Sequence, residues 1–138
     1  MSAFAVNVEN SIRPLRPADL ERVIAIDLGH VGESRRGFFE KRLAHAKQHP
    51  DDFVHVGAVR NGSLVGFAFA RILRGEFGRD QAIATLDTVS VEHDSRESGV
   101  GHALMDSLIA IMRQKGVRSL QSQSIAWNRQ RVFPGICA

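Results

Sequence analysis

The sequence has no tyrosine and only one cysteine, Cys137. Because one thiol excludes an intramolecular disulfide, the fold depends on a buried core, and the composition fits a reducing compartment. No apolar run approaches the roughly 20 residues of a membrane-spanning helix. Residues 1–8 also lack the basic start of a signal peptide. We therefore expect a cytoplasmic protein that does not enter a membrane.

A strong excess of one charge sign is missing as well. The 18 basic and 15 acidic side chains leave a formal net charge of +3. Acids such as Glu76, Asp80 and Glu97 lie among the arginines, and no basic run is interspersed with stacking aromatics. This pattern argues against a nucleic-acid partner. Arginine suits phosphates and carboxylates, so a polyanionic small ligand fits the composition better.

The chain of 138 residues is long enough for one domain, 1–138, with its own core. Hydrophobic periodicity and the positions of glycine and proline predict eight elements. These are a strand at 12–15, helices at 17–29 and 34–49, strands at 53–60, 64–73 and 82–91, a helix at 100–115 and a strand at 117–126. Asn61-Gly62 predicts a hairpin, whereas the helix at 100–115 makes a parallel crossover. We expect an α/β fold with a mixed, mostly antiparallel sheet flanked by helices.

The same periodicity predicts which side chains face the core, and it predicts that Ser34 caps the second helix. The core-facing residues expected from the pattern are Leu20, Val23, Ile24 and Leu28 in the first helix, Val65, Phe67 and Phe69 in the strand 64–73, and Leu104, Leu108, Ile111 and Met112 in the last helix.

The segment after the strand that ends at Val91 carries the most informative pattern. Gly99 and Gly101 lie between this strand and a predicted helix, and glycine allows close backbone approach and unusual φ angles. Backbone N–H groups of residues 96–101 can therefore point at one spot beside the positive end of a helix. Such a loop suits a pyrophosphate. The alternative is a loop that only turns a strand into a helix.

Three phosphate-loop patterns compete for this segment. The Walker A string is absent, and a dinucleotide fingerprint fails because Leu104 replaces its third glycine. The third pattern, Arg96-x-x-Gly99-x-Gly101, strongly resembles the acyl-CoA-binding motif of the GNAT superfamily of N-acyltransferases. The resemblance extends over roughly residues 12–128 as an order of elements, and its specific residues lie mainly between Asp87 and Leu104.

The resemblance implies acetyl-CoA as a cosubstrate, with no metal. Its pantetheine arm is expected to pair with backbone in the strand end, and its pyrophosphate with the loop. The residues implied are Val89, Ser90 and Val91 for the arm, and Arg96, Glu97, Ser98, Gly99, Val100, Gly101 and His102 for the phosphates. Asn128 matches a position where the family often has a cofactor-contacting asparagine; a cap or turn residue is the alternative.

The implied reaction is direct attack of a primary amine on the thioester. A free alkylamine has a pKa of roughly 10.4, so a carboxylate is needed to remove its proton. Asp87 is the first candidate for this catalytic base and Glu92 the second. The alternative for Asp87 is a polar residue paired with a nearby arginine.

The sequence departs from the family pattern near its end. Many members protonate the leaving thiolate with a tyrosine, and this chain has none. Residues 131–138 stand where members continue into a helix and a final hairpin, so we expect a fold that lacks this hairpin. An uncovered edge strand at 117–126 then predicts a homodimer. A non-catalytic acyl-CoA-binding or interaction domain is the second functional hypothesis.

Overall fold

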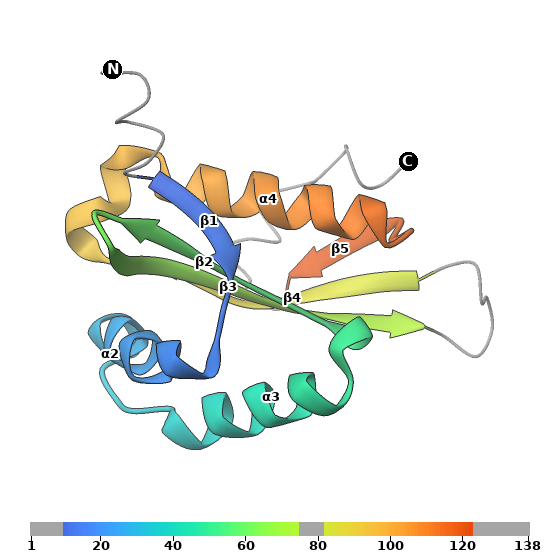
Figure 1. The fold of residues 1–138 in the computed structure, drawn as a ribbon, viewed down its shortest axis with the longest axis horizontal. Coiled ribbons are helices and arrows are strands. Elements are labelled where there is room, and N and C mark those ends of the chain that lie inside the picture. Colours follow the sequence, from blue (N-terminus) through green and yellow to red (C-terminus); the bar gives the residue numbers. More distant parts are fainter. Residues whose placement is uncertain (1–9, 75–81, 123–138) are drawn as a thin grey trace.

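The computed structural model describes residues 10–74 and 82–122 (Figure 1). The expected order of elements is confirmed. It comprises β1 (Asn10–Pro14), the 3-10 turn η1 (Pro17–Asp19), α2 (Leu20–Val31), α3 (Arg36–Gln48), η2 (Pro50–Asp52), β2 (Phe53–Arg60), β3 (Ser63–Arg74), β4 (Ala82–Val91), η3 (His93–Ser98), α4 (Val100–Gln114) and β5 (Ser119–Ser122). The predicted departure at residues 131–138, Asn128 and most of the predicted dimer surface lie outside the described residues.

The five strands form one sheet in the order β1-β2-β3-β4-β5. The first four are antiparallel neighbours, and β5 pairs with β4 in parallel. Figure 1 shows α2 and α3 on one face of this sheet and α4 on the other. The predicted mixed, mostly antiparallel α/β sheet is therefore confirmed. None of the helices among the described residues is long and apolar enough to span a membrane.

Each face of the sheet has its own apolar cluster. Phe39 of α3 packs against Phe67 and Phe69 of β3 on the α2/α3 face. On the other face, Leu104 and Leu108 of α4 are fully buried against β2, β3 and β4. Burial of side chains this size stabilises the fold by roughly 1.5–3 kcal/mol each.

The hairpin between β2 and β3 has the local geometry that its sequence predicts. Asn61 has φ 54° and Gly62 has φ 83°, and two consecutive positive φ angles characterise a type I′ turn. Asparagine and glycine tolerate these angles better than other residues do. This turn fixes the register of β2 against β3.

Three predictions of local detail are wrong. Leu28 is 44% exposed, because the inner face of α2 instead contains Asp27. Val65 lies in the α4 core, away from Phe67, because Val59 pairs with Leu64 and Ala58 with Gly66, which leaves Val65 as an extra residue. Ser34 does not cap α3, which begins at Arg36 with no side-chain cap.

His55 on β2 is a partly buried titratable group. Its ring stacks on Phe69 at 4.2 Å between centroids, and among the described residues its Nε2 atom has no hydrogen-bond partner. Burial, followed by the nearby Arg42 guanidinium, lowers the pKa of His55 to about 4. The imidazole is therefore neutral in the folded protein at pH 7.

We expect the stability of the protein to fall as pH falls from about 6.5 to about 4. In this window the unfolded chain binds a proton at residue 55 that the folded protein does not, so the free energy of unfolding decreases by up to roughly 3 kcal/mol. Urea unfolding of the parent and of His55→Leu between pH 7 and 4 measures this. The variant is expected to lose most of the slope, whereas His49→Gln, at an exposed position, keeps it.

The carboxylate of Asp19 does not obscure this window. The Arg13 hydrogen bond lowers the pKa of Asp19, so the stability that this group contributes is lost only below its ordinary value of 3.8. An unchanged slope in His55→Leu between pH 6.5 and 4 would assign the pH dependence to other groups.

Candidate functional site

The strand β4 changes direction at a bulge. Leu86 pairs with Ala70 and Thr88 pairs with Phe69, so Asp87 is an extra residue with no partner on β3. Before the bulge, Leu86 packs into the core under α4; after it, Val89 does. Because side chains alternate along a strand, the extra residue puts both Asp87 and Thr88 on the α2/α3 face.

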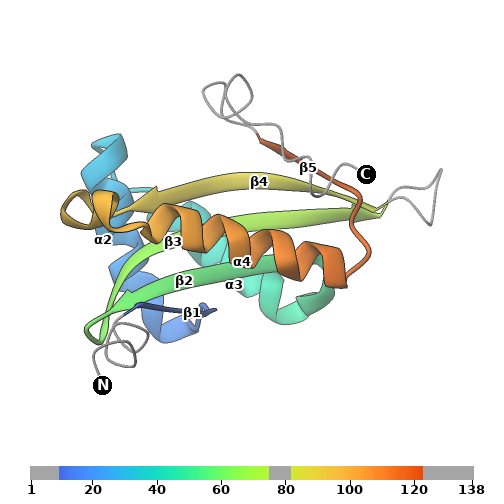
Figure 2. The same ribbon diagram turned by 90° about the horizontal axis from the view of Figure 1, so that it is seen from above.

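Among the described residues, β5 pairs only with the first half of β4. Its described residues pair with Ile83–Leu86 and not beyond. Figure 2 shows the two strands diverging toward the C-terminal end of β4. Among the described residues, the β5 side of β4 is therefore without a strand partner from Asp87 to Val91.

The backbone of this open edge presents hydrogen-bonding groups. The amide of Glu92 donates to Val65 O at 2.8 Å, which makes residues 92 and 65 a hydrogen-bonded pair. By the alternation of an antiparallel ladder, Ser90 then bonds to β3, while the N–H and C=O groups of Val89 and Val91 point to the open edge. His30 Nε2 donates to Val91 O at 2.7 Å. An extended ligand that contains amide groups can therefore form hydrogen bonds with the backbone of this edge, as a neighbouring strand would.

The start of α4 lies at the end of this edge. Gly99 has φ 83° and precedes a helix whose first turn carries no side-chain cap. The N–H groups of that turn therefore point out of the helix, at the positive end of its dipole. The approach of α4 is close: a Cβ on Gly66 of β3 would lie 3.1 Å from both Ser90 O and Leu104 Cδ1. Gly66 thereby sets the helix start beside the β4 backbone.

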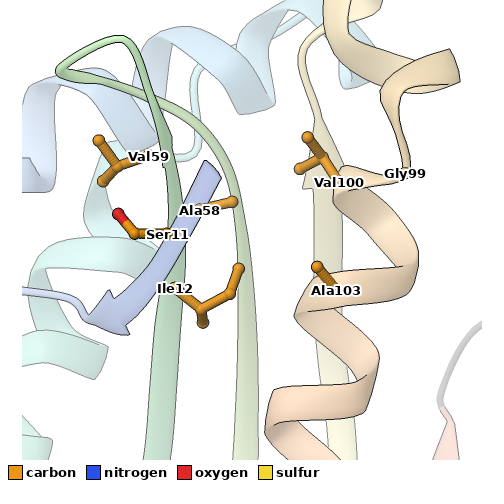
Figure 3. A pocket seen from close by; sticks show the side chains of 7 residues that line it. All are labelled: Ser11, Ile12, Ala58, Val59, Gly99, Val100 and Ala103. Carbon is orange, nitrogen blue, oxygen red and sulfur yellow. The ribbon is translucent and has the colours of Figure 1, made fainter. Parts of the chain in front are cut away.

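A small cavity lies on the other side of the first turn of α4, between that turn and strands β1 and β2 (Figure 3). Its volume is about 160 Å³. Ile12, Ala58, Val59, Val100 and Ala103 give it mostly apolar walls. A charged phosphate does not suit such walls. Of these two sides of the helix start, the side of the β4 edge is therefore better suited to a charged ligand.

Asp87 is held by two arginines. Its side chain is 9% exposed, and Arg42 Nη1 donates to Oδ2 at 2.6 Å. Arg71 donates to both oxygens, from Nε at 2.9 Å and from Nη2 at 3.1 Å. The pairing with arginine that the sequence left open is therefore observed. The role of Asp87 as a base stays a prediction.

Glu92 ties the end of β4 to α2. Its carboxylate accepts a hydrogen bond from Arg22, whose Nε also donates to Leu64 O at 2.9 Å. His30 and His93 stack beside it with ring centroids 5.0 Å apart. These contacts hold the open edge of β4 against α2. His102, on the first turn of α4, is exposed.

The arginine cluster that sequence reasoning missed lies on the α2/α3 face. Arg35, the residue before α3, makes two hydrogen bonds to Asp27, at 2.8 and 2.5 Å, and reaches Thr88 Oγ1 at 3.4 Å. Together with Arg42 and Arg71 it brings three guanidinium groups to the β4 bulge. The apolar pattern of α2 concealed Asp27, and the arginines lie far from the bulge in the sequence.

A five-stranded mixed sheet with β4 and β5 splayed beside a glycine-containing helix start is the architecture of the GNAT acetyltransferases. The chain belongs to this family: the sequence profile of the Acetyltransferase (GNAT) family matches residues 20–132.

Known relatives agree with the fold. A [ribosomal protein bS18]-alanine N-acetyltransferase from Escherichia coli is 24% identical over 111 residues, which is 80% of this chain and 67% of that protein. A crystal structure of the ribosomal-protein-S18-alanine N-acetyltransferase from Escherichia coli superposes with a TM-score of 0.67, at 23% identity and with 85% of this chain and 70% of that chain covered. An acetyltransferase from Trypanosoma brucei gives 0.69 at 23% identity, with 83% and 82% covered.

Proposed function

We propose that this chain is an N-acetyltransferase that transfers the acetyl group of acetyl-CoA to a primary amine by direct attack on the thioester. The observation that carries the proposal is the open edge of β4 at Val89–Val91, which ends beside the uncapped first turn of α4. An amide-bearing arm ending in a pyrophosphate matches this pair of features.

The residues of this chain have separate tasks in binding the cosubstrate. The N–H and C=O groups of Val89 pair with the pantetheine amides, as an added strand would. The backbone of residues 96–101 and the helix start bind the pyrophosphate. When bound, acetyl-CoA supplies an activated carbonyl. The backbone N–H of Val89 or Val91, which points to the open edge, would donate a hydrogen bond to the oxyanion that develops on this carbonyl.

The proton of the amine needs a path away from the reacting nitrogen. Asp87 is proposed as its acceptor because it lies at the bulge, where β4 leaves β5. The three hydrogen bonds from Arg42 and Arg71 fix its position. The positive charge of the arginines also favours a neutral amine, which is the nucleophilic form. Glu92 is held by Arg22 at the far end of the edge and is the second candidate.

For the acceptor we propose the α-amine of a protein or peptide. The support is the Escherichia coli relative, whose name gives an alanine of a ribosomal protein as its acceptor. At 24% identity the particular protein does not transfer to this chain.

A non-catalytic acyl-CoA-binding domain is the second candidate, and two observations favour it. Both oxygens of Asp87 accept hydrogen bonds from arginines, and the sequence has no tyrosine to protonate a leaving thiolate. Such a domain binds acetyl-CoA through the same edge and transfers nothing.

Two measurements on the same preparation separate these candidates. Calorimetry with CoA reads binding, and thiol release with a panel of amines reads transfer. The panel contains peptides with a free N-terminus, the same peptides N-acetylated, free lysine and a polyamine. The enzyme is expected to bind CoA and to release thiol with free-N-terminal peptides only. Binding without release from any amine supports the non-catalytic domain, and no CoA binding overturns both.

A further inference from the structure

The arginine cluster at the β4 bulge consists of Arg35, Arg42 and Arg71. Two carboxylates, Asp27 and Asp87, pair with it, so three positive groups face two negative ones among the described residues. His55 is partly buried beside it and adds no charge at neutral pH. The cluster therefore has one net positive charge.

The charges are arranged by depth. The carboxylates lie at the bottom, with side chains 1% exposed for Asp27 and 9% for Asp87. The guanidinium side chains of Arg35 and Arg71 are 37% and 36% exposed. An incoming molecule therefore meets Arg35 and Arg71 before the two carboxylates that pair with them.

The exposed arginines keep donors available. Arginine has five N–H groups, and among the described residues the hydrogen bonds of Arg71 use only Nε and Nη2. Aromatic rings hold the rest of the cluster in place: the guanidinium carbon of Arg42 lies 4.9 Å from the Phe38 ring centroid, and that of Arg35 lies 5.6 Å from it. Fixed guanidinium groups with spare donors bind carboxylates well.

The cluster also borders free space. A cavity of about 360 Å³ lies between Arg71, Phe53 and the end of α3, with His49 and Asp52 among its other walls. This leaves room, next to Arg71, for the part of an acceptor that follows its amine.

We propose that Arg71, together with Arg35, recognises a carboxylate of the acceptor, so that the preferred substrate is an amine with a carboxylate only a few bonds away. This inference rests on the proposed function and narrows its acceptor class. The carboxylate belongs either to an acidic side chain near a peptide N-terminus or to a free amino acid such as glutamate. Polycationic acceptors are disfavoured because the bulge repels them.

The test compares acceptors that differ only in charge. Three peptides with the same N-terminal alanine have glutamate, glutamine or lysine at positions two and three, and free glutamate forms a fourth arm. We expect kcat/KM to be roughly 10- to 100-fold higher for the glutamate peptide than for the glutamine peptide, the range of one charge-assisted hydrogen bond. The lysine peptide should be the poorest of the three. If free glutamate exceeds the glutamate peptide, the carboxylate is that of an amino acid.

The variant Arg71→Gln tests whether Arg71 causes the preference for the glutamate peptide. Asp87 keeps its hydrogen bond to Arg42, so this variant is expected to fold. It should lose most of the preference for glutamate over glutamine. Both peptides are compared in the same variant, so a general loss of rate from the weaker hold on Asp87 cancels in this ratio. Arg36→Gln is the matched control: Arg36 is exposed on α3 and pairs with Glu21, away from the bulge. It removes the same charge and should keep the preference.

Binding is measured separately, so that a protein that transfers nothing still tests the inference. Calorimetry with CoA present compares the glutamate and lysine peptides in parent and Arg71→Gln. Tighter binding of the glutamate peptide that disappears in Arg71→Gln supports the inference even without thiol release, and then only the proposed function fails. Equal binding of both peptides, a preference for lysine, or a glutamate preference that survives Arg71→Gln overturns the inference and leaves acetyl transfer standing.

Discussion

Gly101→Asp should abolish CoA binding in a protein that folds normally. Gly101 lies in the first turn of α4, and a Cβ there would meet only Val91 Cγ2, at 3.8 Å, an ordinary contact. The substitution therefore adds charge without a steric clash. One carboxylate about 4 Å from a phosphate charge costs on the order of 4 kcal/mol at a surface-like dielectric. That corresponds to a loss of roughly 1000-fold in affinity, which calorimetry measures.

The control for this variant is Gly101→Ala, which adds the same Cβ with no charge and should bind CoA within a few-fold of the parent. Far-UV circular dichroism checks that both fold. An aspartate variant with parental affinity would remove the first turn of α4 from the cosubstrate site. A parallel loss in the alanine variant would mean that the backbone there has no room for any side chain once CoA is bound.

Asp87→Asn should lower stability and transfer rate together while leaving CoA affinity nearly unchanged. The Arg42 side chain is 11% exposed, and it would lose its charged partner. Removing one partner of a buried pair typically costs about 3–5 kcal/mol, and we expect the lower end because Arg71 reaches solvent. If Asp87 also accepts the proton, the rate falls by a further ~10²- to 10⁴-fold. Urea unfolding and thiol release measure the two effects.

A double variant separates the two roles of Asp87. In Asp87→Asn/Arg42→Gln the unpaired buried cation is gone, so part of the lost stability should return. The rate should remain low if the carboxylate takes the proton. Recovery of rate along with stability would assign Asp87 to holding the bulge in place, and a single Asn variant with the parental rate would end its assignment as the base.

The sequence predicts much of the fold because most of its signals are local. The Asn61-Gly62 turn and the apolar stripe of α4 each depend on neighbours within a few residues, and the bounds of β4 agree to the residue. The ends of the helices were less accurate. The helix expected at 34–49 spans Arg36–Gln48, because backbone geometry rather than a capping side chain begins it.

The candidate site was predictable only where it is continuous in sequence. The strand end and the glycine loop follow one another, so one motif contains both. The arginine cluster was not predictable, because residues 35, 42 and 71 meet at residues 87 and 88 only after β3 pairs with β4 and α3 packs across them. The bulge itself left no local signal, since nothing in the residues around Asp87 marks an unpaired position. A buried aspartate on an otherwise apolar helix face, Asp27, was the one available hint of a partner arginine.

The bulge in β4 has a consequence for how this chain tolerates changes of length. Because Asp87 is one residue more than β3 requires, a strand without it could pair regularly: Leu86 would keep Ala70 and Thr88 would keep Phe69 as partners. Val89 and Val91 would then still face the α4 core. What the extra residue adds is therefore the carboxylate that Arg42 and Arg71 share, and not the packing of the strand. In evolution, loss of this one residue is expected to spare the core and to remove the charge pairs at the bulge.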